Sequence, residues 1–209
     1  MRTLLIEPHY LGTLEYFVLI KAYDHICLEV HAHYTKQSYK NRAILMSAAG
    51  PVTLSIPVNY TNRTPFREVT IDYRQDWVRE HWGALYSAYG KAPFFEHFSD
   101  EFRRIWEKRH RYLLDLNLEM MSLCLEILQI DRSVSLTEKF QKKAGHRFYD
   151  ARERIHAKKS FEDRELYLPF PYNQIFGSNF APNLSIVDLL MCEGNQASEV
   201  LTRSTPKSQ

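Results

Sequence analysis

The first thirty residues contain two short apolar runs separated by an amphipathic run, and this order constrains the fold more than any other feature of the chain. Thr3–Ile6 is a leucine-rich run that Pro8 ends, and it predicts a buried strand. Thr13 suits the N-cap of an amphipathic helix that extends through Tyr23. His25–Val30 predicts a second strand. A strand, a helix and a strand in so short a span form a βαβ unit, which requires parallel pairing and a right-handed crossover.

The rest of the chain divides into a strand-rich part, residues 1–72, and a helical part, residues 75–203. Strands are expected at 43–47, 52–58 and 68–72, and helices at 76–89, from 95, from 115 and at 185–191 with Gly194 as the C-cap. Because no repeat or linker interrupts the chain, a single domain over 1–209 is expected. The predicted fold class is α/β, with a small, mostly parallel sheet in the N-terminal third and a helical C-terminal part packed on it.

Composition excludes several classes of protein. A net charge of +2 and a pI near 8.4 are too weakly basic for a nucleic-acid-binding surface. The three cysteines lie far apart in apolar runs, which indicates buried, reduced thiols. Glu7 and Pro8 interrupt the apolar start, and three acidic residues interrupt the apolar segment 113–130, so neither a signal peptide nor a membrane span is expected. The expected compartment is the cytoplasm.

Two histidine-containing segments directly follow the first two predicted strands. His9 and Tyr10 come after the first strand, where ligands of open parallel sheets bind, so His9 could act as a general base. If the second strand continued, Glu29, His31 and His33 would share one face and form either a metal site or a polar substrate-binding edge. Packed turns with incidental histidines are the structural alternative for both segments.

Further polar residues are candidates for binding a substrate. Asn41 and Arg42 precede an apolar strand, and Arg42 could hold a carboxylate or phosphate in a bidentate manner. His81 lies on an otherwise apolar helical stripe, and Lys91 follows the break of that helix; core packing and a helix-dipole role are the alternatives. Residues 139–160 hold eight Lys or Arg against two acidic residues, which predicts a solvated face or a lid that orders over a phosphorylated ligand.

Common catalytic and nucleotide-binding motifs are absent from the sequence. It contains no GxGxxG, GxxxxGK[ST], HExxH, CxxC or GxSxG, so a Rossmann dehydrogenase, a P-loop ATPase, a zincin and a serine hydrolase are not expected. The β-α-β order resembles nucleotidyltransferase-like folds, but no HxGH sequence includes His9. No cofactor is assigned.

Spaced motifs over residues 5–195 resemble the WbqC-like family of bacterial proteins. They are IEPHYLGTLEYF, EVHAHYTKQSYKNR, a strand ending in SIPV, HWGALYSAYGKAPFFE and PYNQIFGSNFAPNLSIVDLLMCEG. More distant members carry Asp and Gln near the positions of His31 and His33, which argues against metal ligation there. Positions on these motifs include Tyr10, Tyr34, Lys36, Asn41, Arg42, His81 and Lys91.

The resemblance implies a role in preparing O-antigen-type surface polysaccharide precursors, through acyl or aminoacyl transfer to an activated amino sugar. In this transferase-like interpretation His9, His33 and Lys36 are catalytic candidates, and no metal is expected. The substrate-binding candidates are Tyr10, His31, Tyr34, Asn41, Arg42, His81 and Lys91. The alternative is a non-catalytic binding or scaffold protein in polysaccharide assembly, which the aromatic content of 13% favours.

Overall fold

The computed structural model describes residues 3–176 and 179–206, so residues 1–2 and 207–209 of the expected single domain, and residues 177–178, lie outside the description. Its centre is a four-stranded sheet of β1 (Thr3–Ile6), β2 (His25–Leu28), β7 (Ser133–Leu136) and β8 (Phe148–Asp150). The strand order is β7-β2-β1-β8, and every pair is parallel. Helix α1 (Leu14–Lys21) connects β1 to β2, so the predicted βαβ unit is confirmed.

Two of the four sheet strands come from the second half of the chain, whereas the sequence placed the whole sheet within residues 1–72. The β7 strand reads Ser-Val-Ser-Leu and leaves Val134 and Leu136 exposed, so it has no buried apolar alternation to detect. The β8 strand has three residues and lies inside the basic run. The α/β class is confirmed, but residues distant in sequence complete its sheet.

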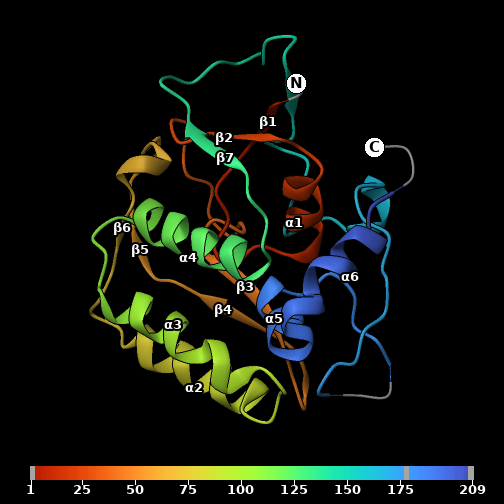
Figure 1. Ribbon diagram of the computed structural model, residues 1–209. Coiled ribbons are helices and arrows are strands. Elements are labelled where there is room, and N and C mark those ends of the chain that lie inside the picture. The colour runs from red at the N-terminus through yellow and green to blue at the C-terminus, as the bar shows by residue number, and fades with distance from the viewer. Residues whose placement is uncertain (1–2, 177–178, 207–209) are drawn as a thin grey trace.

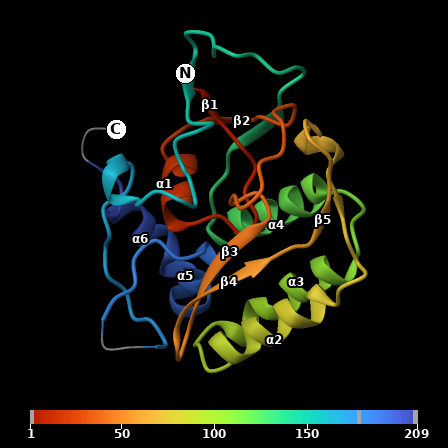
Figure 2. The same cartoon turned by 180° about the vertical axis from the view of Figure 1, so that it is seen from behind.

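The other predicted strands form two separate antiparallel pairs. β3 (Arg42–Ser47) and β4 (Gly50–Ser55) make a hairpin around Ala48 and Ala49, and Gly50 takes a φ of +111°. β5 (Val58–Asn59) pairs with β6 (Thr70–Ile71). These pairs lie between the parallel sheet and helices α2 (Trp77–Tyr89) and α3 (Phe95–Glu107) (Figure 2).

Five further helices supply much of the core. They are α2 (Trp77–Tyr89), α3 (Phe95–Glu107), α4 (Leu113–Ile127), α5 (Ile186–Glu193) and α6 (Ala197–Arg203), and 3₁₀ turns occur at Phe66–Glu68, Glu162–Arg164 and Gly194–Gln196. The Ser185 hydroxyl accepts from the Val187 N–H, which confirms Ser185 as the N-cap of α5. Within the described residues, none of these helices has both the length and the apolar character to cross a bilayer.

Candidate functional site

The two faces of the parallel sheet are covered differently. Leu4, Ile6, Ile26 and Leu28 point to one face, and each is at most 1% exposed. On the other side, residues 137–147 cross above the strands on their way from β7 to β8; we call this segment the arch (Figure 1). Helix α1 lies on the opposite side of the sheet from the arch. One sheet face is therefore core, and the other faces a long connection without helix or strand.

A cavity of about 560 Å³ lies between the sheet and the arch. We call it the sheet pocket, and its volume is in the range of small-molecule sites. Its lining includes alternate residues of β1 and β2, two adjacent residues of β7, the first residue of β8, several arch residues, and Glu29 and Arg152 beyond the strand ends. They are Thr3, Leu5, His25, Cys27, Glu29, Ser135, Leu136, Thr137, Glu138, Lys139, Gln141, Ala144, Gly145, Arg147, Phe148 and Arg152.

At the carboxyl end of the strands, a buried ion-pair network connects the sheet to the arch. Arg152 Nη1 donates to Glu29 Oε2 at 3.1 Å and to the Gln141 carbonyl at 2.6 Å. Its Nε and Nη2 donate to both oxygens of Asp150, at 2.9 and 2.7 Å. The Glu29 side chain is 1% exposed and that of Arg152 is 8% exposed. The guanidinium also holds the pKa of Asp150 below its usual range.

The Glu29 carboxylate also ends strand β2. Its Oε1 accepts from the backbone N–H groups of His31 and Ala32, at 2.9 and 3.2 Å, and from Thr137 Oγ1 at 3.1 Å. These bonds turn the chain directly after Leu28, so the strand stops two residues before its predicted end at Val30. The expected common face of Glu29, His31 and His33 therefore does not form.

The three residues of that expected face have separate surroundings. The His31 Nε2 contacts the Thr137 carbonyl at 2.9 Å, at the start of the arch. His33 is exposed and bridges to Pro65. Among residues 3–176 and 179–206, no group of three or more His, Cys, Asp or Glu side chains has an arrangement that could hold a metal ion.

At the amino end of the sheet pocket, an imidazole lies between two hydroxyls of the neighbouring strand. The His25 Nδ1 is 2.6 Å from Ser133 Oγ, and its Nε2 is 2.8 Å from Ser135 Oγ. The parallel register pairs His25 with Ser133 and Cys27 with Ser135, so the ring lies along β7. The pocket thus contains a charged cluster at one end and a Ser-His-Ser set at the other.

His9 and Tyr10, the candidates after β1, are packed inside the protein. His9 is 5% exposed and its ring stacks on that of Tyr16 at 4.4 Å, and its buried Nδ1 has no hydrogen-bond partner among the residues that the structure describes. Burial, with a smaller contribution from the Lys40 charge, lowers the pKa of His9 to about 3. The sequence placed this segment at a crevice, and the structure makes it part of the buried surroundings of α1.

Tyr10 and His81, two of the predicted binding residues, are in contact. The Tyr10 hydroxyl is 2.9 Å from His81 Nδ1 and accepts from Trp106 Nε1 at 2.9 Å. The other ring nitrogen of neutral His81 donates to the Ser55 backbone carbonyl, so Nδ1 accepts from the Tyr10 O–H. Burial lowers the pKa of His81 to about 4. This chain of bonds connects the loop after β1 to α2 and α3.

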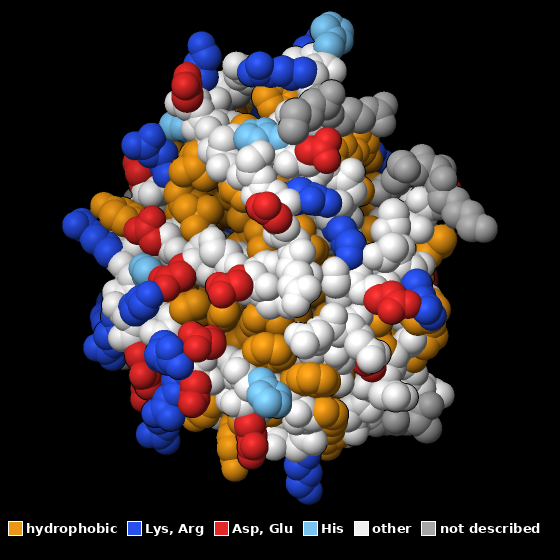
Figure 3. Space-filling model, viewed as in Figure 1, with side chains coloured by type: hydrophobic (Ala, Val, Ile, Leu, Met, Phe, Trp, Pro, Cys, Tyr) orange, Lys and Arg blue, Asp and Glu red, His pale blue; other side chains and the backbone are white. Residues whose placement is uncertain are grey.

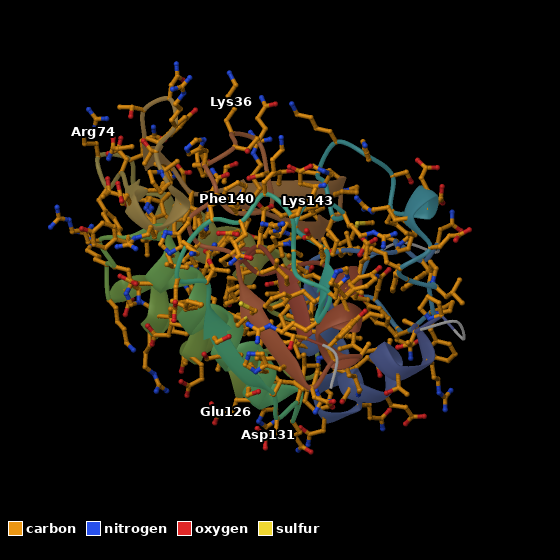
Figure 4. The ribbon with its side chains drawn as sticks, turned by 90° about the horizontal axis from the view of Figure 1, so that it is seen from above. Lys36, Arg74, Glu126, Asp131, Phe140 and Lys143 are labelled. Carbon is orange, nitrogen blue, oxygen red and sulfur yellow. The ribbon has the colours of Figure 1, made fainter. Side chains whose placement is uncertain are left out.

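The remaining predicted residues are exposed, contact another aromatic ring, or bond to the segment at the end of β4. The Tyr34 ring is 4.7 Å from that of Tyr60. Asn41 Nδ2 donates to the Ile56 carbonyl at 2.8 Å, and Arg42 Nε donates to Ser55 Oγ at 3.1 Å. Lys36 and Lys91 are exposed; Figure 4 shows Lys36 pointing outward.

None of the ten predicted site residues lines the sheet pocket. The sequence indicated Glu29 as part of a metal site or a polar substrate-binding edge, and Arg152 only as part of a basic run. It did not indicate His25 or Ser135. Glu29 and Thr137 each directly follow a strand, a position at which open parallel sheets bind ligands. For Thr137 this signal can be used only after β7 has been recognised as a strand.

Comparison with known proteins places the chain in a family. The uncharacterized protein Rv1507c of Mycobacterium tuberculosis (strain ATCC 25618 / H37Rv) is 25% identical over 225 residues, covering 94% of this chain and 96% of that protein. No solved structure matches the chain significantly. The model of the WbqC-like protein family matches residues 7–165. This segment includes the pocket residues His25, Glu29, Ser135 and Arg152. The chain therefore belongs to the WbqC-like protein family.

Proposed function

We propose that the chain binds an anionic, activated sugar in the sheet pocket and modifies it as a step in preparing O-antigen-type surface polysaccharide precursors in the cytoplasm. The observation that carries this proposal is the pocket itself, a cavity of about 560 Å³ between an open parallel sheet and the arch. Its polar lining includes carboxylate, guanidinium, ammonium, imidazole, amide and hydroxyl groups. Such a mixed lining is suited to a polar small molecule rather than to an apolar one.

The sheet topology supports a ligand near the carboxyl end of the pocket. Numbered by their order along the chain, the strands read 3-2-1-4 across the sheet, and the direction of winding reverses between β1 and β8. Ligands of open α/β sheets bind outside the carboxyl ends of the strands at such a reversal. Glu29 follows β2 and Arg152 follows β8, so their ion pair spans this region.

The charge of the arch supports an anionic ligand. Lys139, Lys142, Lys143 and Arg147 lie on it with a single acidic residue, Glu138, and Lys139 and Arg147 line the pocket. Figure 3 shows Lys, Arg and His side chains over the arch at the top of the molecule. In Figure 4, Phe140 and Lys143 lie along it. A phosphate or nucleotide diphosphate would therefore meet favourable potential at the pocket rim.

The predicted site residues on the loop after β2 fit the same proposal, because they could contact a ligand that extends out of the pocket. The bond between His31 Nε2 and the Thr137 carbonyl joins the loop after β2 to the start of the arch. Along that loop, Lys36 and Arg42 supply cations and Asn41 an amide. The proposed reaction is transfer of an acyl or aminoacyl group to the amine of the sugar.

Thermal-shift measurements against nucleotide sugars and acyl thioesters test this proposal. We expect stabilisation by at least one nucleotide sugar, and we expect Arg147→Ala and Lys139→Ala to reduce it. Lys143→Ala is the matched control, because Lys143 lies on the same arch but does not line the pocket. Arg42→Ala reports separately on the outer loop. The pocket would be contradicted as the binding site if no compound stabilised the protein. An equal loss of ligand-induced stabilisation in the pocket variants and in the Lys143 control would also contradict it.

A non-catalytic binding role is the second candidate function, and the free edge of the sheet favours it. Among the strands of residues 3–176 and 179–206, β7 pairs only with β2. Val134, Leu136 and Phe140 are 40%, 44% and 53% exposed on and beside this edge. Exposed apolar side chains on an edge strand are typical of surfaces that accept another chain. This role would be supported instead if the chain associates with another chain through β7 and is stabilised by no small molecule of the panel.

A further inference from the structure

We infer that Ser135 is a nucleophile in the sheet pocket and that His25 is its general base. This inference rests on the proposed acyl transfer and assigns its reacting groups. The observation that motivates it is the contact of 2.8 Å between His25 Nε2 and Ser135 Oγ, with both residues lining the pocket. This distance is within the range over which a base removes a hydroxyl proton.

The contacts of His25 are compatible with the tautomer that a general base requires. Ser133 Oγ lies 2.6 Å from His25 Nδ1 and 3.5 Å from the Asp24 carbonyl. The ring proton is assigned to Nδ1, which donates to Ser133 Oγ, and the Ser133 O–H is directed to the Asp24 carbonyl. A neutral imidazole has only one N–H, so Nε2 presents its lone pair to the Ser135 O–H. Asp24, Ser133 and His25 thus form a chain that orients the base toward Ser135.

The position of the pair in the fold gives it access to a substrate. Ser135 and His25 line the pocket, whereas Ser133 does not, so the orienting contact lies outside the cavity and the reacting contact within it. Arg147 lines the same cavity with its guanidinium 5.0 Å from the Phe148 ring. A cation in the pocket is suited to the negative charge that develops on a carbonyl oxygen under attack.

The proposed step conserves atoms and electrons. Ser135 Oγ attacks the carbonyl carbon of an acyl thioester, and its proton moves to His25 Nε2. The tetrahedral adduct collapses with cleavage of the C–S bond, and the thiolate leaves with the proton from Nε2. The amine of the sugar then attacks the seryl ester and loses a proton to Nε2, and that proton returns to Ser135 Oγ as the amide product departs.

The inference is tested with p-nitrophenyl acetate and a fluorophosphonate as probes on the full-length protein, read out by intact mass and peptide mapping. We expect one adduct per chain, on Ser135. Ser135→Ala should abolish it, and His25→Gln should slow it by roughly 100- to 10,000-fold. Ser160→Ala is the matched control, because Ser160 is an exposed serine that does not line the pocket, and its labelling should match the wild type.

Two further readouts separate catalysis from a structural role of the Ser-His-Ser set. Labelling of the wild type should fall on acidification, whereas the residual labelling of His25→Gln should not. Ser133→Ala should slow labelling without moving the adduct from Ser135. Absence of an adduct, an adduct on another residue, or equal rates in the wild type and His25→Gln would overturn the inference. Because Ser135→Ala can still be tested for stabilisation by nucleotide sugars, failure of the binding proposal is distinguishable from failure of this one.

Discussion

Replacing Glu29 by Gln tests whether the carboxylate at the end of β2 holds the arch on the sheet. Gln retains one carbonyl oxygen for the N–H groups of His31 and Ala32 and for Thr137 Oγ1. Its amide nitrogen, however, replaces the oxygen that accepts from Arg152 Nη1, so a donor faces a donor. Breaking a buried ion pair from one side costs about 3–5 kcal/mol.

The structure places the expected loss at the lower end of that range. Arg152 keeps its two bonds to Asp150, whose side chain is 38% exposed, so the guanidinium stays partly compensated. We therefore expect Glu29→Gln to lower the free energy of unfolding by about 3 kcal/mol. For a chain of this size that corresponds to a fall in Tm of roughly 6–12 °C.

Urea unfolding followed by tryptophan fluorescence measures the stability, and limited trypsin digestion reports on the arch. Because Arg152 also donates to the Gln141 carbonyl, cleavage at Lys139, Lys142 and Lys143 should become faster in the variant. Glu138→Gln, an exposed carboxylate on the same arch, is the control and should change the stability by less than about 0.5 kcal/mol. A loss below about 1 kcal/mol together with unchanged cleavage would refute this view of the ion pair.

Two other predictions follow from buried groups. His9 and His81 have folded-state pKa values of about 3 and 4, below the unfolded value near 6.5, so the unfolded chain binds more protons below pH 6.5. Each histidine should therefore lower the free energy of unfolding by about 2 kcal/mol as the pH falls to 5. In His81→Gln, the free energy of unfolding in urea should depend less on pH between 6.5 and 5. The same pH dependence in the variant and the wild type would contradict this. Gly194 takes a φ of +52°, and a Cβ there would lie 2.4 Å from the Phe94 ring, so Gly194→Ala should lower the free energy of unfolding by more than the roughly 1–2 kcal/mol that backbone strain alone costs, and Tm should fall. Gly83→Ala, in the open middle of α2, should raise Tm instead, and similar Tm values for both would be evidence against the argument.

The elements with strong local patterns were predictable from sequence. Thr3–Ile6 is a strand with the predicted bounds, because an apolar run ended by Pro8 has few alternatives. The helix after Asp76 and the Ser185 cap followed from apolar periodicity and cap chemistry. The three cysteines are buried and free, as their apolar surroundings predicted. Each of these features depends on residues within a few positions of one another.

The candidate site depends on contacts between distant residues. Glu29 and Arg152 are 123 positions apart, and His25 and Ser135 are 110 positions apart. β7 is stabilised by its pairing with β2 rather than by buried side chains of its own, so its local sequence does not distinguish it from a loop. The sequence by itself determined the α/β class and the first βαβ unit, because short-range apolar periodicity specifies them. Only the tertiary structure decided which polar groups share a cavity, because parallel pairing aligns strands whose separation along the chain leaves no local signal.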